Sequence, residues 1–207
     1  MKTMAILSSL RQNLRIRGLA QLVAEERGVA AVEFALILPI MIALWFGGVE
    51  MTRALSVDRR LNAFASSIGD LVARTKTISY TQINDIFDLS DGAMFPYSDT
   101  GMSMRITAVD IDKDGNAKVA WSRSRGSALP AYSKTTNVNT SVPAALRPAN
   151  NPVQIIMAEV SQPYTPAVGH MLIGDSTFDE RMFFVPRLIN QIKICPTADA
   201  ASCVTTI

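Results

Sequence analysis

Histidine and cysteine are scarce in this sequence. Its 207 residues include one histidine, His170, and two cysteines, Cys195 and Cys203. A zinc site usually needs four such ligands, and one histidine with a closely spaced cysteine pair does not supply them. The sequence also lacks a phosphate loop of the G-x-x-x-x-G-K type and a G-x-S-x-G nucleophile elbow. We therefore expect no metal and no cofactor.

One short segment has the composition of a nucleophile site. "GDST", residues 174–177, resembles the nucleophile block of one esterase family. A serine nucleophile needs a histidine to activate it, and no histidine follows Ser176, while His170 precedes it in an expected loop. We expect no enzymatic activity, and an anchored envelope enzyme is the weakest of the functions that we consider.

Charge is nearly balanced overall but is unevenly distributed. The net charge is +2, and residues 1–28 hold five basic and two acidic residues, so the remainder carries −1. Basic residues before an apolar helix favour a cytoplasmic N-terminus, although Arg53, Arg59 and Arg60 beyond it weaken the bias. We expect the C-terminal part outside the cytoplasm. No basic stripe is interleaved with aromatic residues, so we expect no nucleic-acid partner.

What the sequence does contain is one long apolar run. Between residues 29 and 49 the only strongly polar side chain is that of Glu33. As a helix, these positions span roughly 31 Å, the thickness of the hydrocarbon core of a bilayer. The run predicts a helix that crosses the bacterial cytoplasmic membrane once, preceded by a basic leader over residues 1–28.

The helical pattern continues beyond this run. Apolar residues from 57 to 71 step by four, three, four and three positions, which is one helical stripe. Its members are Val57, Leu61, Phe64, Ile68 and Leu71. We predict one helix to about residue 73, with residues 50–76 as its extracytoplasmic continuation; the alternative is a separate surface helix after a turn at Gly47 and Gly48. Pro39 removes one backbone hydrogen bond, so we expect a kink there.

Residues 77–207 have the pattern of an α+β globular domain. Residues 79–92 predict a short helix, with Thr81 as its cap and Ile83, Ile86 and Phe87 on one face. Residues 126–152, rich in Ser, Pro, Asn and Ala, predict a long loop. The predicted strands, which we expect to form a small antiparallel sheet, are residues 102–111, 116–124, 153–164, 180–187 and 190–195. Pro163 indicates a sheet edge or a strand end.

The turn "DKDG", residues 112–115, has two interpretations. Asp110, Asp112 and Asp114 have the spacing that begins a calcium loop, but position twelve, which should be a bidentate Glu, is Trp121. Because β patterns flank the turn, a hairpin is the favoured interpretation.

The two cysteines lie close together near the C-terminus. In a domain outside the cytoplasm, a disulfide between Cys195 and Cys203 is the natural interpretation, and two unpaired thiols are the alternative. By loop-closure entropy this disulfide would contribute roughly 2–3 kcal/mol.

The start of the apolar run carries a specific pattern. Gly28 is followed by Val29, then by Glu33 and Phe34, in "GVAAVEFALILP". Residues 27 to about 62 resemble the start of the TadE-like family, minor pilins or pseudopilins of the tight-adherence (Flp) pilus, and "FFVPRL" resembles its late segment. The resemblance implies a type IV pilin-like fold and cleavage after Gly28 by a prepilin peptidase, with Glu33 as the fifth-position acid. It also implies other pilins and tight-adherence secretion components as partners.

The chemistry of the segment agrees with this resemblance. Cleavage would free the α-amine of Val29, and Glu33 of one subunit would pair with the ammonium of its neighbour, which offsets the desolvation of both groups. Small residues such as Ala31 and Ala35 permit close helix approach. The alternative is a permanently anchored envelope binding module in which Gly28 stays uncut.

Overall fold

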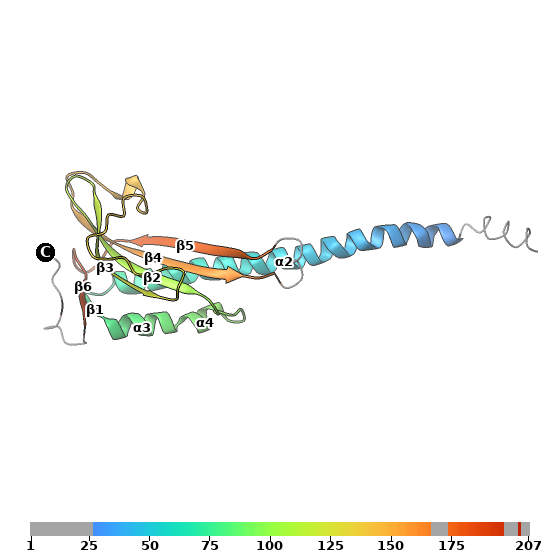
Figure 1. Cartoon of the computed structure of the whole chain (residues 1–207), viewed down its shortest axis with the longest axis horizontal. Helices are drawn as coiled ribbons and strands as arrows, with labels where there is room; N and C mark the ends of the chain where they lie inside the picture. Colours follow the sequence, from blue (N-terminus) through green and yellow to red (C-terminus); the bar gives the residue numbers. More distant parts are fainter. Residues whose placement is uncertain (1–26, 167–173, 197–202, 204–207) are drawn as a thin grey trace, which may run out of the picture. The chain divides into compact units, whose positions relative to one another are not determined.

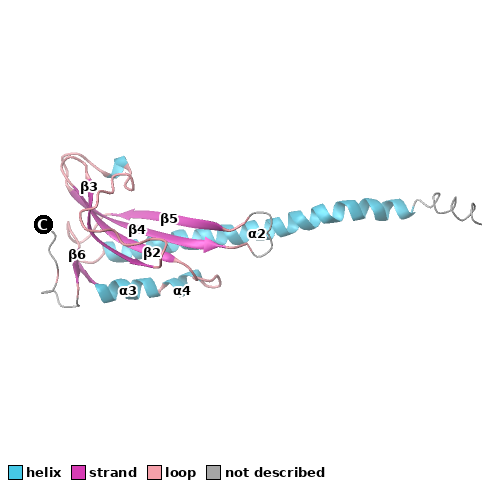
Figure 2. Ribbon diagram, viewed as in Figure 1, coloured by secondary structure: helices cyan, strands magenta, loops and turns pink. Residues whose placement is uncertain are grey.

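The protein has an α+β fold, in which a long N-terminal helix precedes an antiparallel sheet (Figures 1 and 2). The computed structural model describes residues 27–166, 174–196 and 203. The chain divides into two compact units, residues 1–49 and 50–207, which are described separately below. The predicted fold class is confirmed.

Helix α2 extends from Arg27–Ala73 without interruption, as predicted. The alternative of two helices joined by a turn at Gly47 and Gly48 is wrong, because both residues are helical. Pro39 lies inside the helix, where it cannot donate a backbone hydrogen bond; a kink at this position stays a prediction.

Four strands form the main sheet of the second unit. Their order is β3-β2-β4-β5, and every neighbouring pair is antiparallel. The strands are β2 (Ser103–Ile111), β3 (Ala117–Arg125), β4 (Val153–Tyr164) and β5 (Ser176–Phe184). The predicted hairpin is confirmed, whereas β5 begins earlier than predicted. Pro163 lies at the end of β4, which is an interior strand.

One face of the sheet packs against α2. The buried stripe on the helix includes Leu61, Phe64 and Ile68, as predicted, but Leu71 is 43% exposed and Val72 is buried in its place. A Cβ added at Gly69 would overlap the ring of Phe184 in β5. Glycine at this position therefore permits the close approach of helix and sheet.

Helix α3 (Tyr80–Asp88) begins with a capping box, and Ser79 is its cap. Ser79 has an extended backbone, its hydroxyl accepts from the backbone N–H of Gln82, and the Gln82 side chain accepts from the Ser79 backbone N–H. Thr81 lies inside the first turn, so the predicted cap was wrong. A short helix, α4 (Ser90–Met94), follows.

A second, two-stranded sheet differs from the prediction. Strand β6 (Lys193–Cys195) does not join the antiparallel sheet; it pairs in parallel with β1 (Thr77–Ser79), which was not predicted. Three-residue strands are too short for a period-two pattern, and only the folded chain brings these segments together. Cys195 and Cys203 form the predicted disulfide, so the alternative of unpaired thiols is wrong.

The long connection from residue 126 to 152 covers part of the other sheet face. It contains one 3₁₀ turn, η1 (Ala144–Leu146), and otherwise confirms the predicted loop. Its residues Val138 and Val142 are buried in a second apolar cluster with side chains of β2, β3 and β4.

Candidate membrane anchor and processing site

The apolar segment of α2 is covered by nothing else in the described chain. Residues 28–49 are all exposed, and large side chains such as Leu36 and Leu44 are each 70% exposed. Within the described residues, α2 is the one helix that is both long enough and apolar enough to cross a membrane. Its most apolar window has a mean hydropathy of 2.3. An apolar surface of this length requires lipid or other helices around it. The segment is therefore a single-pass membrane anchor with a C-terminal domain.

The residues of the predicted processing site lie at the start of this helix. Gly28 and Val29 are its second and third residues, and a side chain at Gly28 would meet no other atom within 4 Å. Glu33 lies one helical turn after Val29, on the same side, because residues four apart are neighbours on a helix surface. Glu33 and Phe34 are exposed, and Glu33 has no ion pair with any described side chain.

A second carboxylate, which the sequence analysis missed, lies immediately after the apolar segment. Glu50 is only 4% exposed, and its carboxylate accepts a hydrogen bond from the phenol of Tyr164 at the end of β4. Burial, followed by this bond to Glu50, raises the pKa of Tyr164 to about 12. A pocket of about 530 Å³ adjoins the pair, and Arg53, Pro96, Tyr97, Ser98 and Thr165 also line it. An acid directly following an apolar run was the available signal, but nothing in the sequence indicated Tyr164 as its partner.

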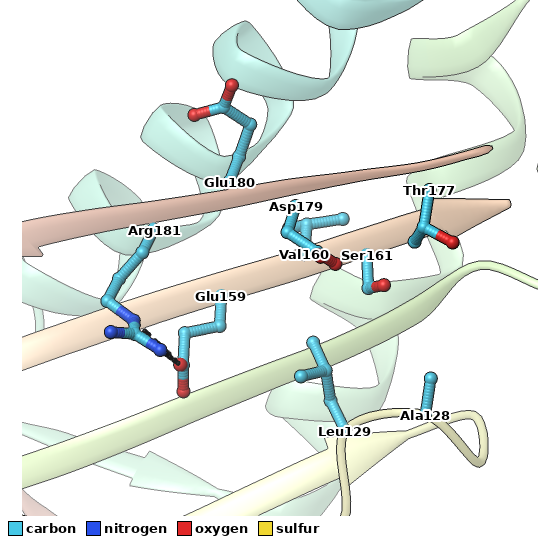
Figure 3. Close-up of a pocket in the computed structure, with 9 residues that line it drawn as sticks. All are labelled: Ala128, Leu129, Glu159, Val160, Ser161, Thr177, Asp179, Glu180 and Arg181. Atoms are coloured by element: carbon cyan, nitrogen blue, oxygen red, sulfur yellow. Dashed lines mark hydrogen bonds and ion pairs between the residues drawn. The ribbon is translucent and has the colours of Figure 1, made fainter. Parts of the chain in front are cut away.

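A pocket of about 600 Å³ is lined by residues of β4, β5 and the long loop (Figure 3). Glu159 lines it and receives two ion pairs, from Arg105 at 2.7 Å and from Arg181 at 2.8 Å. The three residues face one another across neighbouring strands β2, β4 and β5. Arg105 also donates to the carbonyl of Pro130, which ties the long loop to the sheet. Because both carboxylate oxygens are engaged, this group ties β2, β4 and β5 together.

Ser176, His170 and the aspartates of the hairpin were weaker candidates from the sequence. Ser176 is an exposed residue at the start of β5, and His170 lies outside the described residues. Asp112 closes the β2–β3 hairpin by accepting backbone hydrogen bonds from Asp114 and Asn116, and the bond from Asn116 is the main cause of its lowered pKa. Across the described part of the chain, no three His, Cys, Asp or Glu residues are grouped to hold a metal ion. Asp112 thus acts in the hairpin, and Asp110 accepts a hydrogen bond from Gln154 of β4.

The fold and this site define a class, an α+β domain carried by one apolar N-terminal helix. The family model described as TadE-like protein matches residues 28–69 of the chain, which are α2 from its second residue to Gly69. The match confirms the resemblance predicted from the sequence over this segment. It associates the protein with tight-adherence (Flp) pilus systems and, through them, with the membrane and pilus components. Comparison with curated proteins and with solved structures returns no match.

Proposed function

We propose that this protein is a minor pilin or pseudopilin that acts in the assembly of a tight-adherence pilus. One observation carries the proposal: the exposed apolar segment of α2 follows Gly28 directly, within the residues that match the TadE-like family. The same surface serves first as an anchor in lipid and then as a packing surface among other pilins. This role requires no catalysis by the second unit.

Processing would occur at the peptide bond between Gly28 and Val29. A prepilin peptidase removes the basic leader and leaves Val29 with a free ammonium group. Glu33 of a neighbouring subunit then pairs with this ammonium, since each group offsets the cost of burying the other. The pair fixes the axial register of adjacent helices.

The proposed orientation places the N-terminus in the cytoplasm and the second unit outside. The Cys195–Cys203 disulfide supports it, because such bonds persist in oxidising compartments. The excess of basic residues before the apolar segment supports the same orientation. The β-rich unit is then free to contact other components of the pilus system.

The first test is the intact mass and N-terminal sequence of the protein recovered from membranes of its native host. We expect a chain that begins at Val29. Replacing Gly28→Leu should block the cut, whereas Gly47→Leu should not, although both glycines lie in α2 and neither has an atom within 4 Å of an added Cβ. A wild-type chain that still begins at Met1 contradicts the proposal and favours the permanently anchored binding module.

The second test concerns Glu33. Glu33→Ala should leave cleavage intact but reduce pilus formation and the recovery of partner subunits with the protein, because the carboxylate of the pair is lost. Glu33→Asp keeps the charge and should restore part of both. Pilus formation and partner recovery unchanged in Glu33→Ala would remove the assembly role proposed for this residue.

A further inference from the structure

Phe95 has an unusual exposure for its residue type. Its side chain is 74% exposed, more than that of any other large hydrophobic residue described. It lies in the connection between α4 and β2, outside the apolar part of α2. In this position the ring can bury its apolar area only against something outside the described chain, such as a membrane.

The position of this connection is fixed by its neighbours. Pro96 and Tyr97 line the same pocket as Glu50 and Tyr164. Figure 1 shows the α4–β2 connection at the end of the second unit toward which β4 runs. Glu50 is bonded directly to Val49, the last residue of the apolar segment. The pocket rim therefore lies next to the point where the chain leaves the hydrocarbon.

The rim has the composition of a membrane interface. Tyr97 and Tyr164 are half-buried rings with polar hydroxyls, and the guanidinium of Arg60 lies 5.7 Å from the centre of the Tyr97 ring. Arg53 lines the pocket and is exposed, whereas the acidic Glu50 is buried beneath Tyr164. Aromatic residues and arginines gather at the headgroup level of membrane proteins. Here Glu50 is turned inward, whereas Arg53 and Arg60 are exposed.

We infer that the pocket residues Arg53, Tyr97 and Tyr164, together with Phe95, which directly precedes the pocket residue Pro96, rest on the phospholipid headgroup layer of the membrane that holds α2. Phe95 enters the boundary with the acyl chains, and Arg53 faces the lipid phosphates. The inference rests on the membrane anchoring in the proposed function, and it adds a second contact between the protein and the bilayer.

The test uses the full chain in phospholipid vesicles with an NBD fluorophore on one introduced cysteine. Both natural cysteines are in the disulfide, so the introduced cysteine is the one reactive thiol. The test position is Phe95→Cys, and Leu36→Cys in the apolar segment reports whether α2 is inserted. The matched control is Leu188→Cys, because Leu188 is also exposed, at 57%. Its neighbour Arg187 donates a backbone hydrogen bond to the carbonyl of Ala73, so Leu188 lies near the far end of α2. Ala73 is about 35 Å along the helix from Glu50.

Phospholipids carrying a nitroxide on the acyl chain then serve as quenchers. We expect them to remove about half or more of the fluorescence at positions 36 and 95 and almost none at 188. Quenching at 36 without quenching at 95 overturns the inference and leaves the anchor intact. This holds even if the label at 95 is shielded from water, because a protein partner can shield it without bringing it to the lipid. Equal quenching at 95 and 188 also overturns it. No quenching at 36 contradicts the membrane span itself, and the inference fails with it.

Discussion

Tyr164 donates a hydrogen bond to the carboxylate of Glu50 and thereby joins two residues that are 114 positions apart in the sequence. The bond ties the end of β4 to the first residue of the second unit. It therefore fixes the sheet to α2 at the point where the apolar segment ends.

Replacing Tyr164→Phe should lower the free energy of unfolding of the second unit by about 1–2 kcal/mol, because the buried Glu50 carboxylate loses a donor. Denaturant unfolding of the full chain in detergent measures the change. Tyr97→Phe is the matched control, since its ring contact with Arg60 does not need the hydroxyl. Equal stability of the wild-type and Tyr164→Phe proteins would show that the bond adds nothing.

The same bond predicts a loss of stability at high pH. The pKa of Tyr164 is raised from 10 to about 12 by burial and by Glu50. A group whose pKa is raised on folding contributes stability that is fully present below its unfolded value, here pH 10, and is lost as the pH rises toward 12. The wild-type protein should therefore lose stability between these values more steeply than Tyr164→Phe. Absorbance of the phenolate should show one tyrosine fewer titrating near pH 12 in the variant.

Replacing Glu159→Ala should be the most destabilising of these changes, by about 3–5 kcal/mol, because it leaves the buried guanidinium of Arg105 without its ion-pair partner. The matched control is Asp88→Ala, which breaks an exposed pair with Arg125 and should cost at most about 1 kcal/mol. Thermal unfolding of the three proteins measures both effects. Similar losses in the two variants would contradict the role of Glu159 between β2 and β5.

Replacing Gly69→Ala should destabilise the packing of α2 on the sheet by about 1–3 kcal/mol, since the new methyl group would overlap Phe184. Phe184→Leu in the same chain should recover part of the loss by making room. Gly92→Ala is the control, because no atom lies within 4 Å of an added Cβ there. A Gly69→Ala protein as stable as wild type would mean that Phe184 moves aside at no cost.

Much of the fold was predictable because its signals are local. The apolar run, the helical stripe from Val57 to Ile68 and the β2–β3 hairpin each follow from the spacing of nearby residues. The same is true of the candidate site, where Gly28 and Glu33 form a short continuous pattern that the TadE-like family model also matches. Local periodicity and charge need no knowledge of what packs against them.

The cap of α3 shows where local reasoning misled. Ser79 and Thr81 are both good capping residues. Ser79 is the cap because Gln82, three residues later, accepts a hydrogen bond from its backbone N–H and completes a capping box. The exposure of Leu71 has a different cause. Phe64, Ile68 and Val72 recur every four residues and share the buried face of the helix, whereas Leu71 lies beside that face.

By itself the sequence determined the anchor, the helix that continues from it, the antiparallel sheet and the cysteine pair. Only the tertiary structure decided that β1 pairs with β6, that Glu159 lies between Arg105 and Arg181, and that Glu50 is buried under Tyr164. The physical reason is sequence separation. These contacts join residues that are 22 to 116 positions apart, and the pairing of such residues depends on the whole packed core.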